Sequence, residues 1–597
     1  MTALPDPPAS MVPLAAAVVC RGRSEAQRAY LMQCAGLPAD ASLPPLDPEE
    51  DPRADVVDAI LDRTWRARTK ADRLALGQVF TPRPVARQVL LELPLGPGPS
   101  VRILDPACGG GIFLIEAAAW LAASLSETPG LARAWALWER IAGVDIDPGA
   151  AALARLLLGS SLVDALGDED PGTLPLPQVW LADALNPETE VLIEAFAPTH
   201  VLGNPPYLEA KRMPNPDRAR LRTQLPELTG AFDLYMAFCH LALRWVGPTG
   251  VVALVLPNKV QVARYAASLR ATLTASGRLH ALLDLSELAV FARIGVYPIV
   301  VILGPERALG SYKACHRVAS LDAMGRAALV GVDVPHELPL AVMQPPTWFT
   351  LPNSAIAALA DDLLERCPRL EAVATVRSTC SFHRKGLRER FVKDGEALPR
   401  GIPYLGGRSW SRRNEIRPYQ VDWTGHRIDF DAEALRTLRN PLPPLECFMR
   451  PKVIFCQHAR TLIAYGDVEG RFVTKDVFPI VLPHDDSPEA VCGLTAILNS
   501  RLMSVLYATW FRGIQISGGY LHFLPVYLRR MPVPAPERWT DLAEVVAGLQ
   551  THPDEAKAEE IDARVMEAYA LSPEDSALVR RLADHELGFA PAMLARR

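Results

Sequence analysis

The stretch Ile103-Leu104-Asp105-Pro106-Ala107-Cys108-Gly109-Gly110-Gly111-Ile112-Phe113-Leu114 decides the fold. Its apolar start indicates a strand that ends at Asp105, and the residues after the three glycines are typical of the start of a helix. Glycines permit a tight turn and let a ligand approach the backbone closely. The stretch is neither a dinucleotide fingerprint, because GxGxxG is absent, nor a phosphate loop, because no GK[ST] follows. Three glycines can also simply connect a strand to a helix, so a binding role depends on the surroundings.

Short apolar runs alternate with longer amphipathic stretches from residue 101 to about residue 304. These strand candidates are VRILDPA, IAGVDID, QVWLADAL, THVLGNPPY, GVVALVLP, LHALLDLS and PIVVILG. Strands that alternate with helices predict an α/β fold with a mostly parallel sheet and helices on both faces. The long interval between the first two strands predicts one enlarged helix over Glu116–Arg140.

Two further acids follow later strand candidates. Asp145 ends IAGVD, and an acid at the end of the second strand can accept hydrogen bonds from both ribose hydroxyls. Asp183 follows QVWLA, where a carboxylate can accept from an exocyclic adenine amino group. Each acid taken alone can be a helix cap or a turn residue. Together with Asp105, they place three acids at three successive strand ends, an arrangement that suits a nucleoside.

The fourth strand candidate ends in Asn204-Pro205-Pro206-Tyr207. The two prolines fix φ and restrict the residue before each of them, so the turn is rigid. Such a turn presents two acceptors, the Asn204 side chain and the Pro205 carbonyl. Two acceptors aimed at the hydrogens of an sp2-hybridised amine localise its lone pair and help it attack an electrophilic methyl group. Tyr207 offers a stacking face for a planar ring.

The 597 residues allow about three to five domains, and 49% hydrophobic with 22% charged residues are typical of a folded protein.

The second half of the chain differs in charge. The whole chain carries a formal net charge of -6, yet residues 377–417 hold eleven Lys/Arg against four Asp/Glu. This excess predicts phosphate contacts, with arginines able to read guanine edges. Taken alone, an arginine-rich run can also be a solvated surface.

The order FTPRP, DPACGGG, VDID, ADAL and GNPPY resembles the γ-type adenine-N6 DNA methyltransferases with a TaqI-like or Eco57I-like layout. The similarity covers residues 75–305 and continues more weakly over 440–575. It implies a Rossmann-like, seven-stranded S-adenosyl-L-methionine-dependent methyltransferase domain, followed by an α+β domain that recognises the DNA target. The segments expected are an N-terminal part (1–75) with a tail loosely ordered to about residue 50 and a helix over 54–74, a catalytic domain (76–310), a connection (311–370), a target-recognition domain (371–540) and a helical end (541–597).

The resemblance also assigns roles to residues of this chain. Those expected to bind the cofactor S-adenosyl-L-methionine are Thr81, Asp105, Ala107, Gly109, Gly111, Asp145 and Asp183. The catalytic turn is Asn204, Pro205, Pro206 and Tyr207, with Tyr207 and Phe291 stacked on the two faces of a flipped adenine. The residues expected to contact double-stranded DNA are Arg384, Lys385, Arg388, Arg408, Arg412 and Arg413. The chain departs from the family at Gly110, where a serine is usual, and at Ala184, where an aromatic residue is frequent.

The sequence gives no sign of a disulfide framework, a metal site, a membrane span or a fused nuclease. The ten cysteines are scattered without a CxxC pair and no HExxH occurs, so we expect free thiols, a cytoplasmic location and no metal site. No run of 18 apolar residues occurs, so no membrane span is expected. A fused nuclease needs a further domain of some size, and the 75 residues before the Thr81 motif hold only one predicted helix and a Pro-rich tail. This predicts a methyltransferase without a fused nuclease. Whether a separate restriction endonuclease or phage-defence proteins accompany it stays open.

Two other functions fit part of these motifs. An NPPY turn also occurs in methyltransferases that act on a protein glutamine or an RNA base, although those chains are usually short. A DNA specificity subunit without catalysis would explain the basic second half, but it would not need the three acids and the glycine loop.

Overall fold

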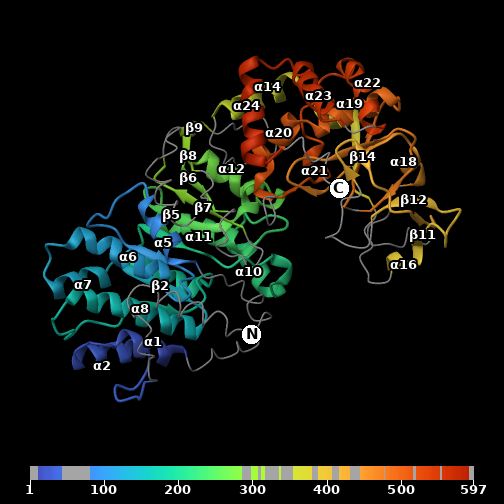
Figure 1. Cartoon of the computed structure of the whole chain (residues 1–597). Coiled ribbons are helices and arrows are strands. Elements are labelled where there is room, and N and C mark those ends of the chain that lie inside the picture. The colour runs from blue at the N-terminus through green and yellow to red at the C-terminus, as the bar shows by residue number, and fades with distance from the viewer. Residues whose placement is uncertain are drawn as a thin grey trace. The chain divides into compact units, whose positions relative to one another are not determined.

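The computed structural model describes residues 11–43, 81–285, 297–306, 311–315, 335–337, 348, 354–379, 387–406, 416–430, 444–475, 477–514, 520–551 and 554–589. The chain divides into two compact units (Figure 1). The first holds residues 1–340 with 350–352, and the second holds residues 341–349 with 353–597.

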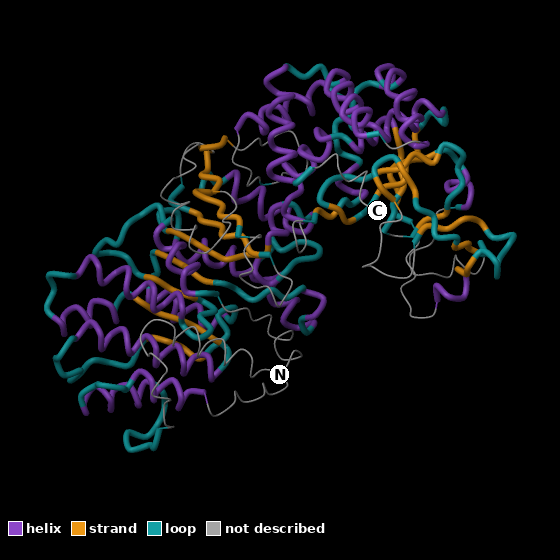
Figure 2. Tube along the Cα trace, viewed as in Figure 1, coloured by secondary structure: helices purple, strands orange, loops and turns teal. Residues whose placement is uncertain are grey.

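The first unit is built on a nine-stranded sheet of order β3-β2-β1-β4-β5-β7-β6-β8-β9 (Figure 2). Its strands are β1 (Ile103–Asp105), β2 (Ile141–Asp145), β3 (Gln178–Leu181), β4 (His200–Gly203), β5 (Val251–Pro257), β6 (Leu279–Asp284), β7 (Pro298–Leu303), β8 (Ser311–Cys315) and β9 (Pro335–Glu337). Strands β1 to β5 are parallel, and β7 runs antiparallel between β5 and β6. All seven predicted strands are confirmed as β1–β7, whereas the sequence did not predict β8 and β9.

Helices cover both faces of this sheet. The described helices of the first unit are α1 (Met11–Val19), α2 (Glu25–Cys34), α5 (Arg83–Leu91), α6 (Ile112–Ala122), α7 (Gly130–Trp138), α8 (Pro148–Leu166), α9 (Pro187–Phe196), α10 (Asn215–Gln224), α11 (Leu234–Val246) and α12 (Ala267–Ala275). One core cluster joins α1, α2, α5, α6, α7 and α8 to one face of the sheet. Helix α11 packs on β4 and β5. Buried residues of these strands such as Val201 and Leu254 are not part of that cluster, because they face the other side of the sheet. The predicted two-faced α/β arrangement is therefore confirmed.

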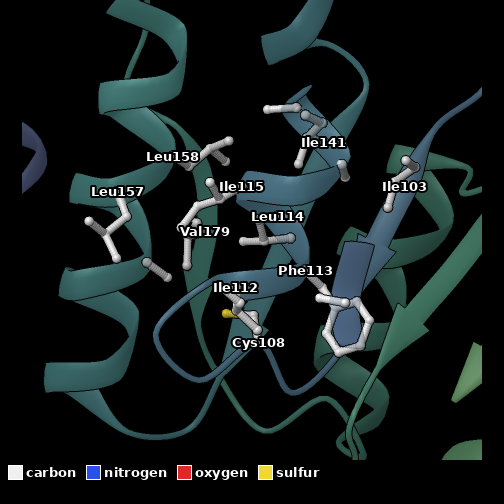
Figure 3. Packing of buried hydrophobic residues seen from close by; sticks show 14 of the residues in the cluster. Ile103, Cys108, Ile112, Phe113, Leu114, Ile115, Ile141, Leu157, Leu158 and Val179 are labelled. Atoms are coloured by element: carbon white, nitrogen blue, oxygen red, sulfur yellow. The ribbon is translucent and has the colours of Figure 1, made fainter. Parts of the chain in front are cut away.

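The core below the glycine loop holds the loop in place. Leu114 and Ile115 of α6 pack among Ile103, Ile141, Val179 and the α8 leucines (Figure 3). Burying each such side chain contributes roughly 1.5–3 kcal/mol. A Cβ on Gly143 of β2 would come within 2.8 Å of Leu114 Cδ1 and 3.0 Å of Cys108 Sγ, so this strand approaches the loop and its helix closely.

Two expectations about helices were wrong. Residues 116–140 form α6, a short 3-10 turn (Ala123–Leu125) and α7 instead of one helix. Gly130 begins α7 against α8, where a Cβ would lie 2.3 Å from the Leu166 carbonyl oxygen. Residues 11–43, expected to be loosely ordered, form α1 and α2, which pack on α8. Gly159 allows this approach, because a Cβ there would lie 2.7 Å from Cys34 Sγ. The helix expected over residues 54–74 lies outside the described residues.

Helix α8 is long and apolar enough to cross a membrane by length and composition, as are the bent pair of helices over 488–499 and 501–514 taken together. In α8, 67% of the most apolar window is buried inside the protein, as in a core helix.

The second unit combines two small sheets with helices. One sheet has the order β10-β20-β16-β18 and the other β11-β15-β12-β19. Their strands are β10 (Ala374–Arg377), β20 (Ile480–Pro483), β16 (Lys452–Phe455), β18 (Ala464–Asp467), β11 (Val392–Asp394), β15 (His426–Ile428), β12 (Ile402–Leu405) and β19 (Val473–Thr474). Two-stranded pairs are β13 (Ile416–Arg417) with β14 (Gln420–Val421) and β17 (His458–Ala459) with β21 (Leu521–His522). The helices are α14 (Ser354–Arg366), α15 (Leu370–Val373), α16 (Leu387–Phe391), α18 (Leu445–Met449), α19 (Pro488–Asn499), α20 (Arg501–Phe511), α21 (Pro525–Leu528), α22 (Thr540–Thr551), α23 (Glu555–Ala568) and α24 (Pro573–Leu582). The predicted α+β character is confirmed.

Candidate functional site

The predicted site residues that follow strands β1 to β4 gather at one edge of the sheet. Strands β3, β2, β1 and β4 are parallel neighbours, so their carboxyl ends lie together. In open α/β sheets this edge is where ligands bind. The loop after β1, the acid that ends β2, the acid after β3 and the turn after β4 therefore surround one place.

The glycine loop is tied to the end of β2. Gly109 and Gly111 adopt φ of 52° and 88°, the left-handed region that glycine tolerates best. The N–H of Gly109 donates to Asp145 Oδ2 at 2.7 Å, and the N–H of Asp147 donates to Asp145 Oδ1 at 2.8 Å. Asp145 thus orients the loop through both of its carboxylate oxygens.

Asp105 is a buried acid beside a second acid. Its side chain is 1% exposed, and its Oδ1 accepts a 3.1 Å hydrogen bond from the N–H of Ala107. Burial and, less strongly, the negative charge of Asp145 raise the pKa of Asp105 to about 8, although the Ala107 hydrogen bond lowers it. A Cβ on Gly203 would lie 2.6 Å from Asp105 Oδ1, so only glycine fits there. Sequence reasoning gave Gly203 no role, although it stands in the GNPPY motif.

The Asn204 turn meets the Thr81 segment. Asn204 Nδ2 donates a 3.1 Å hydrogen bond to Thr81 Oγ1, and Thr81 is buried. The Tyr207 hydroxyl donates to the Val255 carbonyl at 3.0 Å, and its ring stands edge-on to Tyr235 at a centroid distance of 6.4 Å. Burial raises the pKa of Tyr207, which keeps the hydroxyl protonated. The turn is therefore held at both ends.

The loop after Tyr207 is held by an acid that sequence reasoning missed. Asp233 accepts a 2.8 Å hydrogen bond from the N–H of Leu208, and Leu208 pairs in turn with Leu234. Burial raises the pKa of Asp233 to about 6.

Asp183 and its surroundings complete the edge. Asp183 Oδ1 accepts from the N–H of Leu185 at 3.0 Å, and Oδ2 lies 3.4 Å from Arg220 Nη2 of α10. Arg220 also donates to the Leu185 carbonyl at 2.8 Å. Ile146, between Asp145 and Asp147, keeps 40% of its surface exposed although it is large and apolar. Sequence reasoning missed both Arg220 and Ile146; the apolar residue between two aspartates in VDID was the available signal.

Some predicted residues are not placed by the structure. Phe291 and five of the six DNA-contact candidates lie outside the described residues: Arg384, Lys385, Arg408, Arg412 and Arg413. The sixth, Arg388, lies on α16 and is half-buried. The DNA-contact assignments stay predictions.

Two family models match the chain. The Eco57I restriction-modification methylase model covers residues 199–291, which include the Asn204 turn, and the TaqI-like C-terminal specificity domain model covers residues 410–533. These matches confirm the resemblance that the motifs predicted.

Similar proteins agree with these matches. The Type II methyltransferase M.PaeR7I of Pseudomonas aeruginosa is 23% identical over 501 residues, which are 74% of this chain and 82% of that protein. M.XhoI of Xanthomonas vasicola is 25% identical over 491 residues, 72% of this chain and 86% of that protein. The Type IIL restriction-modification enzyme MmeI, solved in complex with DNA, shares the fold with a TM-score of 0.57 at 13% identity, covering 89% of this chain and 81% of its own.

Proposed function

We propose that this chain, which is similar to DNA methyltransferases of restriction-modification systems, transfers a methyl group from S-adenosyl-L-methionine to the N6 amino group of an adenine flipped out of double-stranded DNA. The observation that carries this proposal is the contact between Gly203, which precedes Asn204, and the buried Asp105 below the glycine loop. It brings a turn suited to an amine against a loop suited to a charged, nucleoside-like cofactor.

The residues of the edge fit this cofactor. Burial raises the pKa of Asp105 and so disfavours its carboxylate, which a neighbouring cation would stabilise. The ammonium group of the cofactor's methionine part is such a cation. Asp145, at the end of β2, offers a carboxylate for the ribose hydroxyls, and Asp183 lies at the next strand end for the adenine amino group. Ile146 adds an exposed apolar surface beside Asp145 for the adenine ring. When bound, the cofactor supplies an electrophilic methyl group.

The chain's own residues prepare the target amine. Thr81 engages Nδ2 of Asn204, which leaves the amide Oδ1 to accept from one N6 hydrogen while the Pro205 carbonyl accepts from the other. These acceptors localise the nitrogen lone pair toward the methyl group. Because the interactions strengthen as positive charge develops on nitrogen, they stabilise the transition state more than the ground state. Tyr207 holds the base by stacking.

A direct test maps modified bases by long-read sequencing. DNA is taken from a methylation-free bacterial host that carries the wild-type gene, an Asn204→Ala gene or an empty vector. We expect N6-methyladenine at one short recognition sequence with the wild type only, while purified Asn204→Ala protein binds cofactor within a few-fold of wild type by calorimetry. N4-methylcytosine in place of N6-methyladenine, or methylation by the Asn204→Ala protein, would overturn the assignment. Methylation of RNA or of a protein glutamine without any modified DNA would favour the other NPPY functions.

A further inference from the structure

A cleft of about 690 Å³ opens beside Tyr207 in the first unit. Its lining comes from the chain that follows Tyr207, helix α10, the loop before α11 and the end of β5, with Tyr265 and Tyr297 added from two further segments. Its volume lies within the range of pockets that hold organic ligands. The roles assigned above use Tyr207 and, among the charged groups of the cleft, only Asp233, which accepts from the N–H of Leu208.

The described lining of the cleft is strongly basic. Two carboxylates, Glu209 and Asp233, face five cations, a net charge of +3; the cations are Lys211, Arg212, Arg218, Arg222 and Lys259. Lys211, through a hydrogen bond and its charge, lowers the pKa of Glu209, as do the charges of Arg212 and Lys259. The whole chain carries a net charge of -6, so the charge of the cleft lining is opposite in sign to that of the whole chain.

The arginines of α10 are available to an anion. Arg218 donates to the Ala210 carbonyl at 3.4 Å and to the Asn215 side chain at 2.5 Å, and Arg222 donates to the Gly230 carbonyl at 2.7 Å. Within the described part of the chain, neither arginine has a carboxylate within salt-bridge distance. A guanidinium group has five N–H donors, so both keep donors and an uncompensated charge.

Asn258 supplies an independent sign of a ligand. It follows β5, lines the cleft and is 2% exposed. Its Nδ2 atom is buried and has no hydrogen-bond partner among the residues that the structure describes. Folded proteins avoid this arrangement because the donor loses water and gains nothing. An acceptor on a molecule in the cleft would satisfy this donor.

The aromatic residues identify the kind of anion. Tyr207, Tyr265 and Tyr297 line the cleft beside its cations. Positive charge that follows a backbone, combined with aromatic faces for bases, is how proteins bind single-stranded nucleic acid. A small anion such as free phosphate would need the cations and no rings.

We infer that this cleft binds the target strand itself, with its cations on the phosphates that flank the flipped nucleotide and Asn258 donating to an acceptor of the same strand. The inference rests on the proposed function, because a base stacked on Tyr207 would place the phosphates on either side of its nucleotide at the cleft. The first unit would then contribute DNA contacts of its own, in addition to those predicted for residues 377–417.

The test measures how salt affects binding of the full chain to a fluorescein-labelled, mixed-sequence 12-nucleotide single strand, followed by fluorescence anisotropy. The variant Arg218→Gln/Arg222→Gln removes two cleft charges. The variant Arg218→Lys/Arg222→Lys keeps them, and Arg21→Gln/Arg28→Gln removes two exposed charges on the α1–α2 segment away from the cleft. Each phosphate contact on a single strand contributes about 0.7 to the slope of log K against log salt.

We expect the double Gln variant to lose about 1.4 from this slope, while the Lys variant and the α1–α2 control keep the wild-type slope. Asn258→Leu should weaken binding several-fold at an unchanged slope, because the lost donor is neutral. An unchanged slope in the double Gln variant, or an equal loss in the control, overturns the inference. Base mapping tests the proposed reaction separately. If the double Gln variant loses salt dependence but the wild-type gene yields no N6-methyladenine, the strand site stands and the adenine reaction is refuted. If N6-methyladenine appears but the salt dependence of the variant is unchanged, only the strand site is refuted.

Discussion

Asn204 Nδ2 donates to the Thr81 hydroxyl across 3.1 Å, which joins two motifs that lie 123 residues apart in the sequence. The hydrogen bond determines which end of the amide faces Thr81, and therefore that Oδ1 faces the other way. The resemblance assigns Thr81 to the methionine carboxylate of the cofactor, whereas this contact indicates that Thr81 positions Asn204.

Replacing Thr81 with Val distinguishes the two roles. If Thr81 positions Asn204, loss of one neutral hydrogen bond, about 1 kcal/mol, should lower kcat by about tenfold or less with little change in cofactor affinity. Thr81→Ser retains the hydroxyl and should restore most of kcat. Steady-state kinetics and calorimetry measure the two quantities. A cofactor Kd that rises while kcat holds would return Thr81 to the methionine carboxylate.

The double role of Asp145 gives the second prediction. Asp145→Asn removes one acceptor oxygen, so either the Gly109 N–H or the Asp147 N–H loses its partner. A buried unpaired donor costs roughly 1–3 kcal/mol of folding free energy, and we expect cofactor affinity to fall by about tenfold or more because the loop loosens and the ribose acceptor is weaker. Thermal unfolding and calorimetry test both effects.

Asp147→Asn is the matched control. Asp147 caps α8 by accepting from the N–H of Ala150 at 2.8 Å, and asparagine caps a helix about as well as aspartate. Stability and cofactor affinity should therefore both stay near wild type. If the two variants weaken cofactor binding equally, the ribose site does not depend on Asp145.

The strand candidates and the acids at their ends were predictable because an open parallel sheet makes local rules sufficient. Buried strands are short apolar runs, and a ligand edge needs polar residues directly after them. The division of 116–140 into α6 and α7 was predictable from Pro129, which cannot continue a helix and caps the start of α7. The basic cleft was not predictable, because Lys259 comes from another strand end and joins the α10 arginines only in the fold.

Asp105 predicts a pH dependence of cofactor binding. Its pKa of about 8 lies above the unfolded value, so the carboxyl is mostly protonated in the free protein at neutral pH. Pairing with the cofactor ammonium requires the carboxylate, so binding releases a proton. Affinity should then rise by about tenfold between about pH 6 and about pH 7. Calorimetry in buffers of different ionisation enthalpy measures the released proton.

Asp105→Asn should bind cofactor more weakly and without this pH dependence, because the amide does not titrate. Equal pH dependence in the variant and the wild type would assign the proton to another group. Absence of any pH dependence in the wild type would show that Asp105 does not meet the ammonium group.

Base flipping tests Tyr207 as a stacking residue. Its ring is fixed by the hydrogen bond to Val255 and by the edge contact with Tyr235, so the face it offers is already ordered before a base arrives. Stacking on an aromatic ring is worth roughly 1–3 kcal/mol per base, against a few kcal/mol lost when the base leaves the duplex.

The fluorescence of a duplex with 2-aminopurine at the mapped target should increase on binding. Tyr207→Ala should reduce the flipped population about tenfold or more, and Tyr207→Phe should reduce it less because the ring remains. Asn204→Ala should flip normally and fail to methylate. Phe291→Ala repeats the test for the second face predicted from the resemblance. Normal brightening and a normal rate with Tyr207→Ala would remove Tyr207 from the base site while leaving the role of Asn204 intact.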